Sequence, residues 1–510
     1  MWIGKNYINR NFVNIEGESY EKVNPSTGEV LGTFPKTSAT TVDDSILMAR
    51  KAFKAWKKVS RVKRAELMLK VAEVLERRSK QLATVISLET GKNYNESIAE
   101  VNEALHMAQY AFGSGRTPQG EAIASEIADK DSYMLRKPKG VIAIVSPFNF
   151  PVAIGAFWCA APALVEGNTV ILKPSEDAPY SSQLCAEIYH EAGVPAGVFA
   201  VLHGEGDTGD ALVRGDVDHI CFTGSAEVGQ HIRMVAAESW HKTTSCEMGS
   251  KSAVIVFDDA DLGLALDATV ASAFKLSGQR CVSSGRIIVH KDMMQKFIDP
   301  FVERVKKLKT GNPLTIAGLK GGMLSSDESL NEPLIGVDSG VDYGPLINQQ
   351  GLDKVVKYNE MVFNDPEAHV KLKGEVLDGA GYFMTPTVYA TEWRDVPYLK
   401  NEVFGPHVAI IPFENTDHAV HIYNDTDYGL AVGVLTNDFR KARIMREECD
   451  AGMIYWNGGS IAAESHLAFG GVKKSGNGFP SAARTFRAVT HEVSWTVNHG
   501  EDLSFPQGMK

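Results

Sequence analysis

Short apolar runs alternate with helical segments between residues 140 and 257, and this alternation constrains the fold more than any other feature of the chain. The run VIAIV at 141–145 contains no polar residue, which is typical of a strand buried on both faces. Repeated β-α units of this kind predict a parallel sheet with helices on both faces. Further strands are expected at residues 169–173, 198–202, 219–222 and 253–257, and helices at 151–165, 181–192 and 208–214.

Ligands bind beyond the carboxyl ends of the strands in sheets of this type. The loops that follow Val145, Lys173, Phe222 and Phe257 should therefore carry the binding site. Earlier in the chain, residues 42–56 and 62–85 place apolar side chains at helical spacing, so each is predicted to form one surface helix. After about residue 250 a second α/β region follows, and the alternating pattern at 493–497 predicts a half-exposed terminal strand that pairs with another subunit.

The length and charge of the chain exclude several classes of protein. Its 510 residues are too many for one core, and the composition of 44% hydrophobic and 23% charged residues is that of a globular protein. The net charge of -11, without a dense Lys/Arg run, disfavours nucleic acid and anionic membranes as partners. The longest apolar stretch is too short to span a membrane, and the N-terminus lacks the apolar core of a signal peptide. We expect a cytoplasmic protein.

One of the six cysteines stands in an unusual context. The cysteines show no CxxC and no Cys/His ligand spacing, so neither a disulfide framework nor a metal site is predicted, and five of them are expected to be buried and inert. Cys281 instead lies between Arg280 and Arg286, in the segment SGQRCVSSGR. Neighbouring positive charge lowers the pKa of a thiol, and the thiolate is the reactive form. Cys281 is therefore the candidate nucleophile for covalent catalysis.

Polar residues also occupy the first two expected loops. Asn149 lies between two prolines in SPFNFP, where its amide could donate a hydrogen bond to a developing oxyanion. Lys173 and Glu176 in KPSE suit the ribose hydroxyls of a nucleotide, and Glu176 would repel a 2′-phosphate. Each motif alone also fits an ordinary role, as a self-satisfied turn or as a surface salt bridge.

Two further motifs follow strands or precede them. In FTGS (222–225), Gly224 permits a tight turn and Ser225 can cap a helix whose N-terminus attracts phosphate, although the spacing is not GxGxxG. Glu247 in EMGS is a candidate general base with a raised pKa. A plain N-cap and a structural carboxylate are the alternatives.

Taken in order, these motifs resemble those of the NAD(P)-dependent aldehyde dehydrogenase superfamily, from about residue 20 to 497. The resemblance rests on FNFP, KPSE, FTGS, an EMGS variant of the ELGG box, GQRC, EVFGP at 402–406 and FGGVKKSGNG at 469–478. It implies an α/β fold with a Rossmann-type parallel-sheet cofactor domain, an α/β catalytic domain and a small β oligomerisation element. The expected boundaries are 1–119 and 140–249 for the cofactor domain, 250–475 for the catalytic domain, and 120–139 with 476–510 for the oligomerisation element.

The resemblance also implies the residue roles. Cys281 attacks the aldehyde carbon, the Asn149 amide and the Cys281 backbone N–H hold the oxyanion, and Glu247 activates the water that cleaves the thioester. The cofactor is expected to be NAD, with NADP as the alternative, bound by Lys173, Ser175, Glu176, Phe222, Gly224, Ser225, Val228, Gly249, Glu402 and Phe404. The aldehyde pocket is expected to include Ser283, Ser284, Ser460 and Phe469.

The chain departs from common members of the superfamily in three places. Trp158 stands where many carry a Lys, and Pro480 where many carry a Glu, so the proton relay placed at these positions is in doubt. Residues 315–339 look like an insertion, either a solvated loop or a lid or subunit contact.

Resemblance to particular groups within the superfamily indicates the substrate class and the assembly. Residues 247–249, 456–457 and 475–482 look like those of succinylglutamate-semialdehyde dehydrogenases, and the tail at 497–508 is distantly similar to aminoadipate-semialdehyde dehydrogenases. The expected substrate is a carboxylate-bearing semialdehyde from amino-acid metabolism, with general aliphatic or aromatic aldehydes as the alternative. The family forms homodimers or homotetramers, here through about 120–139 and 484–497.

Two other functions compete with aldehyde oxidation. A thiol esterase or acyl transferase would use Cys281 without redox chemistry, but it needs no nucleotide motifs. A non-catalytic protein on the same fold would have little need to keep Asn149, Glu247 and Cys281 together.

Overall fold

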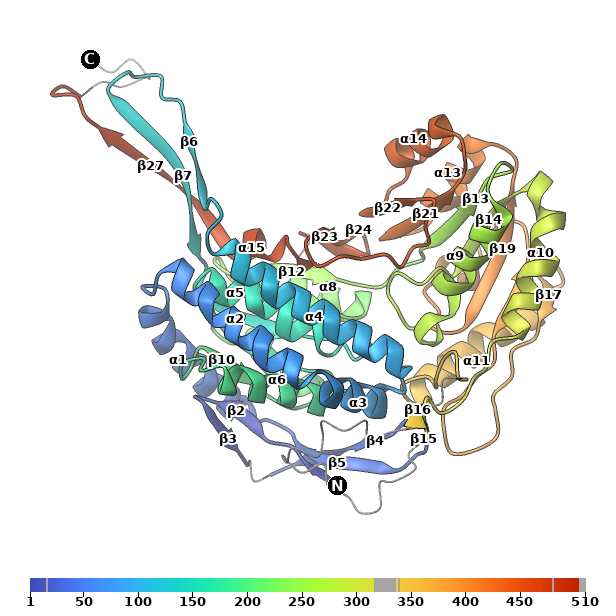
Figure 1. Ribbon diagram of the computed structural model, residues 1–510, viewed down its shortest axis with the longest axis horizontal. Helices are drawn as coiled ribbons and strands as arrows, with labels where there is room; N and C mark the ends of the chain where they lie inside the picture. Colours follow the sequence, from blue (N-terminus) through green and yellow to red (C-terminus); the bar gives the residue numbers. More distant parts are fainter. Residues whose placement is uncertain (15–16, 316–335, 338–339, 479–480, 504–510) are drawn as a thin grey trace.

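The computed structural model describes residues 1–14, 17–315, 336–337, 340–478 and 481–503. Two large sheets organise two lobes, and a narrow three-stranded sheet projects from the body as an arm (Figure 1). In the described residues, no helix is long and apolar enough to cross a membrane. The α/β architecture with parallel strands is the one that the sequence predicts.

The first sheet has eight strands in the order β25-β12-β11-β8-β9-β10-β2-β3. Five neighbouring strands run parallel: β12 (Thr243–Glu247), β11 (His219–Thr223), β8 (Val141–Val145), β9 (Thr169–Lys173) and β10 (Phe199–Val201). The edges are antiparallel: β25 (Gly476–Asn477), β2 (Asn6–Ile8) and β3 (Asn11–Val13). The predicted parallel sheet is therefore confirmed.

Helices cover both faces of this sheet, as the apolar run of β8 requires. Val141 and Ala143 point into a core with α1 (Ala39–Trp56), α7 (Gly206–Arg214) and α8 (Ala226–Ala237). Ile142 and Ile144 point into the opposite core. The helices of that second layer are α2 (Arg61–Arg77), α3 (Ser79–Thr90), α4 (Tyr94–Ser114), α5 (Ala160–Val165) and α6 (Pro179–Glu191).

Two predicted helices differ from the observed ones. The segment 62–85 forms two helices rather than one, because Arg78 leaves helical dihedral angles (φ −96°, ψ 10°) and its guanidinium bonds Glu187 of α6 at 2.7 Å. The segment 151–165 begins with a wide π-helical stretch, η1 (Ala153–Cys159), before α5. Wide turns of this kind are rare and occur often at functional sites.

The second sheet has seven strands in the order β17-β18-β19-β14-β13-β21-β22. All are parallel except β17. The strands are β13 (Ala253–Val256), β14 (Arg286–His290), β17 (His369–Leu372), β18 (Thr387–Ala390), β19 (His407–Phe413), β21 (Ala431–Leu435) and β22 (Met453–Trp456). One face packs against α9 (Leu262–Phe274) and α10 (Lys291–Lys306). The other packs against α11 (Gln349–Phe363), α12 (Pro397–Lys400), α13 (Thr416–Asn424) and α14 (Phe439–Glu448).

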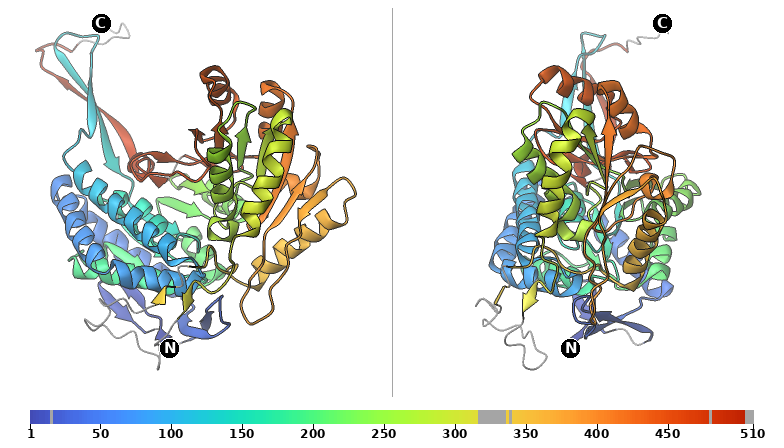
Figure 2. Two further views of the ribbon diagram at one scale, coloured as in Figure 1. Left: turned by 45° about the vertical axis from the view of Figure 1, so that its right-hand side comes forward. Right: turned by 90° about the vertical axis from the view of Figure 1, so that its right-hand side faces the viewer.

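The arm joins segments that are distant in the sequence. Strand β27 (Thr490–Asn498) pairs along its length with β7 (Lys130–Pro138), which also pairs with β6 (Gly120–Ile123). The left view of Figure 2 shows this sheet standing clear of the body. The predicted terminal strand thus pairs with β7 of the same chain along one edge, and its pairing with another subunit stays a prediction. Strand β25, at the start of the predicted oligomerisation segment 476–510, pairs with β12 of the first sheet instead.

Short elements complete the described fold. The N-terminal sheet contains β1 (Trp2–Ile3), β4 (Ser19–Val23) and β5 (Val30–Pro35). Smaller pairs are β15 (Leu314–Thr315) with β16 (Gly336–Val337), β20 (Tyr428–Gly429) with β24 (Val472–Lys473), and β23 (Ala468–Phe469) with β26 (Ser481–Ala482). Two short helices are η2 (Lys275–Gly278) and α15 (Thr485–Ala488). Most of the predicted insertion 315–339, and Pro480, lie outside the described residues.

Candidate active site

A cleft of 880 Å³ opens at the carboxyl ends of β8, β9 and β11. Three of the four loops predicted to carry the site line it. The fourth does not, because Phe257 follows β13 of the second sheet, and the loop after it bonds Thr436 through Asp259. All ten residues predicted for the cofactor, together with Asn149 and Cys281, line the cleft: Lys173, Ser175, Glu176, Phe222, Gly224, Ser225, Val228, Gly249, Glu402 and Phe404.

Cys281 is half-buried, whereas the other five cysteines are buried, and all six are free thiols. The prediction that arginines lower the pKa of this thiol is wrong. The guanidinium of Arg280 bonds Glu96 at 2.8 Å, and that of Arg286 bonds backbone carbonyls, including that of Ile422 at 2.8 Å. Burial, followed by the charges of nearby carboxylates, raises the pKa of Cys281. The resting thiol is therefore protonated at neutral pH.

The loop before Cys281 holds an unusual backbone conformation. Leu276 and Ser277, in η2, both have positive φ, 53° and 55°. Such residues persist only where their surroundings fix them. The Ser277 hydroxyl donates to the Gly344 carbonyl at 2.7 Å, and the Leu276 N–H donates to Glu96 at 3.1 Å. Glu96 of α4 thus holds the nucleophile loop at two points, since it also binds Arg280.

Asn149 lies against the same loop. Its side-chain amide donates to the Gln279 carbonyl at 2.9 Å, two residues before the nucleophile. Its own carbonyl accepts from Lys92 at 2.7 Å. Lys92 forms an ion pair with Glu100 in which both side chains have 0% exposure, and Glu100 also accepts from the Val152 N–H at 2.8 Å. A buried charge pair therefore fixes the turn that carries Asn149.

Glu247 ends β12 and is only 1% exposed. Among the described residues, neither of its carboxylate oxygens has a hydrogen-bond partner, and burial raises its pKa well above the ordinary value, as predicted. Its charge raises the pKa of Cys281, although Glu247 is not among the residues that line the cleft. A buried carboxylate without partners can take up a proton without first giving up a hydrogen bond.

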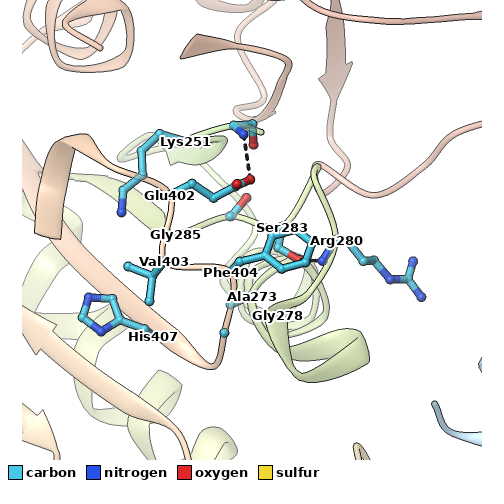
Figure 3. Close-up of a pocket in the computed structure, with 13 residues that line it drawn as sticks. Lys251, Ala273, Gly278, Arg280, Ser283, Gly285, Glu402, Val403, Phe404 and His407 are labelled. Carbon is cyan, nitrogen blue, oxygen red and sulfur yellow. Dashed lines mark hydrogen bonds between the residues drawn. The ribbon is translucent and has the colours of Figure 1, made fainter. Parts of the chain in front are cut away.

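The cofactor-side residues cradle the opposite wall of the cleft. Burial raises the pKa of Glu402 to about 7, and its carboxylate accepts from the Ser250 N–H at 2.7 Å. Figure 3 shows this carboxylate beside Lys251 and Phe404. A Cβ added to Gly249 would come within 2.4 Å of a Glu402 oxygen, so a larger residue there would displace this carboxylate. Phe404 has a positive φ of 62°.

The first-sheet side supplies the rest of the cradle. Ser225 caps α8 by accepting from the Val228 N–H at 3.3 Å. The Lys173 ammonium bonds Glu176 at 3.0 Å, and Lys173 is buried while Glu176 reaches solvent. The cleft thus combines a helix N-terminus with a carboxylate and an ammonium.

The residues predicted for the aldehyde pocket do not line this cleft. The Ser284 and Ser460 hydroxyls form a hydrogen bond with each other at 2.8 Å. Each hydroxyl therefore already has a partner within the protein. Ser283 and Ser284 border a small cavity of 20 Å³ beside Glu402 and Phe404 (Figure 3). Phe469 packs against Trp158 with ring centroids 5.3 Å apart, and the buried Trp158 indole N–H has no hydrogen-bond partner within the described part of the chain.

Several cleft residues have no sequence signal. Asp210 of α7 and His231 of α8 bond at 2.7 Å across the gap between their helices. Asn348 and Lys354 reach the cleft from the second lobe, where Asn348 donates to Asp177 at 3.1 Å. Asn348 and Lys354 reach the cleft because the N-terminal end of α11 packs beside the first sheet.

Comparison with known proteins agrees with this geometry. Residues 12–494 match the aldehyde dehydrogenase family. A putative aldehyde dehydrogenase from Burkholderia cenocepacia is 30% identical with a TM-score of 0.90 and covers 99% of each chain. Betaine aldehyde dehydrogenase from Staphylococcus aureus, solved with NAD+, is 28% identical with a TM-score of 0.89, over 98% of this chain and 96% of that one. PnpE from Pseudomonas sp. WBC-3 is 30% identical with a TM-score of 0.89 over 99% of both chains. With the family match spanning nearly its whole length, the chain belongs to the aldehyde dehydrogenase family.

Proposed function

We propose that this protein oxidises an aldehyde to a carboxylate through a thioester on Cys281, with NAD as the preferred hydride acceptor. The observation that carries the proposal is the single cleft lined by Asn149, Cys281 and all ten residues predicted for the cofactor. Nucleophile, oxyanion donor and nucleotide must converge, because a hydride can leave only after the tetrahedral adduct has formed.

The cleft fits a dinucleotide. Its 880 Å³ falls in the usual range for ligand sites, and its lining combines apolar walls with a few placed polar groups. Val213 and Ile232 offer an apolar slot between α7 and α8, and the N-terminus of α8 at Ser225 suits a pyrophosphate. Glu402 suits a ribose. When bound, NAD would accept the hydride.

The chain's own residues perform the remaining chemistry. The Cys281 thiol releases its proton to solvent as its sulfur attacks the aldehyde carbon, and the Asn149 amide and the Cys281 N–H bind the oxygen that becomes negative. After hydride transfer, Glu247 takes a proton from water, which attacks the thioester and releases the carboxylate. The carboxylate of Glu247 is suited to this role because no hydrogen bond competes for it.

Glu176 supports a preference for NAD over NADP. Its carboxylate lines the cleft next to Lys173, where it would accept from vicinal ribose hydroxyls and repel a 2′-phosphate. Equal kcat/KM values with both cofactors would contradict this preference.

For the substrate we propose a carboxylate-bearing semialdehyde from amino-acid metabolism, on the sequence likenesses at 247–249, 456–457 and 475–482. Because Ser284 and Ser460 satisfy each other, we expect Phe469 and Ser283 to contribute more to the pocket than this pair. Steady-state kinetics with a panel of aldehydes and both cofactors, followed at 340 nm, tests the proposal. Preference for simple alkyl or aromatic aldehydes over glutamate- or adipate-type semialdehydes would refute the substrate class, and the absence of aldehyde-dependent NADH formation would refute the activity.

We further propose that the protein is a cytoplasmic homodimer or homotetramer, with the arm as its oligomerisation element and the two large sheets as cofactor and catalytic domains. The arm exposes apolar side chains, including Ile123, Leu135 and Trp495, which a partner subunit would cover. Light scattering of wild-type protein and Trp495→Glu, beside an exposed-residue control such as Leu264→Glu on α9, measures the assembly. A monomeric wild type would refute it.

A further inference from the structure

Ser250 contacts both sides of the cleft. Its backbone N–H donates to the Glu402 carboxylate at 2.7 Å, and its hydroxyl donates to the carbonyl oxygen of Cys281 itself. The residue is only 3% exposed, and its hydroxyl also lies 2.9 Å from the Ser252 hydroxyl. One buried residue therefore joins the wall that faces the nucleotide to the nucleophile.

The hydroxyl bond depends on the departure from the ELGG box. In EMGS the last position is serine, where ELGG has glycine. A glycine would retain the backbone N–H bond to Glu402 but would have nothing to offer the Cys281 carbonyl. The two bonds of Ser250 can therefore be separated by one substitution, which removes only the contact with the nucleophile.

Glu402 has little room to move independently of this segment. The absent Cβ of Gly249 leaves the space that the carboxylate fills, and the N–H of Ser250 binds one of its oxygens. The carboxylate has two oxygens, so a ligand hydroxyl that bonds Glu402 shares the group with this bond, and any movement of the carboxylate is passed to Ser250. Any resulting shift of Ser250 reaches the peptide that follows Cys281, which is bonded directly to the Cα that carries the thiol side chain.

We propose that Ser250 is a positioning residue that couples occupancy of the Glu402 end of the cleft to the orientation of Cys281. The inference rests on the proposed function, because it takes NAD as the ligand at Glu402. Coupling between two sites is reciprocal and is measurable without turnover. The reactivity of the Cys281 thiol toward an alkylating agent, with and without NAD, therefore reports it directly.

The experiment measures the second-order rate of Cys281 carbamidomethylation by iodoacetamide, from peptide masses, in the absence and presence of saturating NAD. In wild-type protein we expect NAD to change this rate by about 5-fold or more, the lower end of typical coupling between sites. In Ser250→Gly the effect of NAD should shrink below about 2-fold, as expected when the connecting hydrogen bond is lost. Ser250→Thr retains a hydroxyl and should retain the coupling.

Controls separate this coupling from a general loss of structure and from a failure of the proposed function. Ser87→Ala removes a buried hydroxyl that bonds Ser97 at 2.8 Å, and it should leave the NAD effect unchanged. NAD binding is measured in parallel by calorimetry. If NAD binds and Ser250→Gly keeps the full wild-type effect, or wild-type alkylation does not respond to bound NAD, the coupling is refuted while the proposed function stands. If wild-type protein does not bind NAD, both are refuted.

Discussion

Replacing Glu247 by glutamine tests the hydrolytic half of the proposed reaction. The substitution keeps the shape of the side chain but removes its ability to take up a proton. Neither carboxylate oxygen has a hydrogen-bond partner in the part of the chain that the structure describes, so the substitution breaks no observed hydrogen bond. A positioned general base contributes about 10²- to 10⁴-fold to a rate, or about 2.7–5.4 kcal/mol of barrier. Hydride transfer precedes the attack of water, so only thioester hydrolysis should slow by that factor.

Stopped-flow absorbance at 340 nm measures this directly. Mixing Glu247→Gln with NAD and aldehyde should give a burst of one NADH per active site, followed by turnover about 10²- to 10⁴-fold slower than wild type. Glu247 acts as a base only when it is deprotonated, and its pKa is raised. Below that pKa, thioester hydrolysis by the wild type should therefore become about tenfold faster for each unit by which the pH rises, and the variant should lose this dependence. Glu89→Gln, another fully buried carboxylate, should show no burst. Full turnover without a burst, or slowing of the burst phase itself, would refute the assignment.

Three further changes have defined outcomes. Cys281→Ala should abolish NADH formation and leave NAD binding by calorimetry unchanged; residual aldehyde oxidation would contradict the nucleophile assignment. Lys92→Met leaves the Glu100 carboxylate buried and without its ion-pair partner, which should lower the free energy of unfolding by about 3–5 kcal/mol in urea titrations. The double variant Lys92→Met/Glu100→Gln should lower it by less, because no unpaired charge remains. Burial raises the pKa of Glu89 from 4.5 to about 7, so the folded state holds a proton that the unfolded chain releases. Stability from this group is complete below pH 4.5 and is lost as the pH rises to 7; relative to Glu89→Gln, wild type should lose about 3 kcal/mol across that window.

The sequence predicts the cleft well because its signals are local. An uninterrupted apolar run such as that of β8 can only be buried on both faces, and a polar residue directly after it must lie at the sheet edge. This reasoning places Asn149, Lys173 and Ser225 in one cleft. It fails for the loop after Phe257, because an apolar run does not reveal which of two sheets it joins.

The residues next to a long side chain in the sequence likewise do not determine the direction in which that side chain points. Arg280 and Arg286 flank Cys281 in sequence, yet their guanidinium groups bind Glu96 and backbone carbonyls elsewhere. For the same reason the sequence did not predict the hydrogen bonds of Ser250, whose partners Glu402 and Cys281 are remote in sequence. Hydrogen bonds of this kind depend on the tertiary packing of the chain. The spacing of apolar residues in the sequence does not predict that packing.

The charge balance around Cys281 determines when its thiol can react. Burial and the carboxylates of Glu247 and Glu402 all raise its pKa, so a resting thiolate would be an additional buried negative charge. Burial also raises the pKa of both carboxylates, so each further negative charge in this region is costly. A thiolate becomes favourable only when a ligand brings positive charge or when a carboxylate accepts the thiol proton. The reactivity of Cys281 therefore depends on the charges that surround it in the folded cleft, and not on the GQRC segment alone.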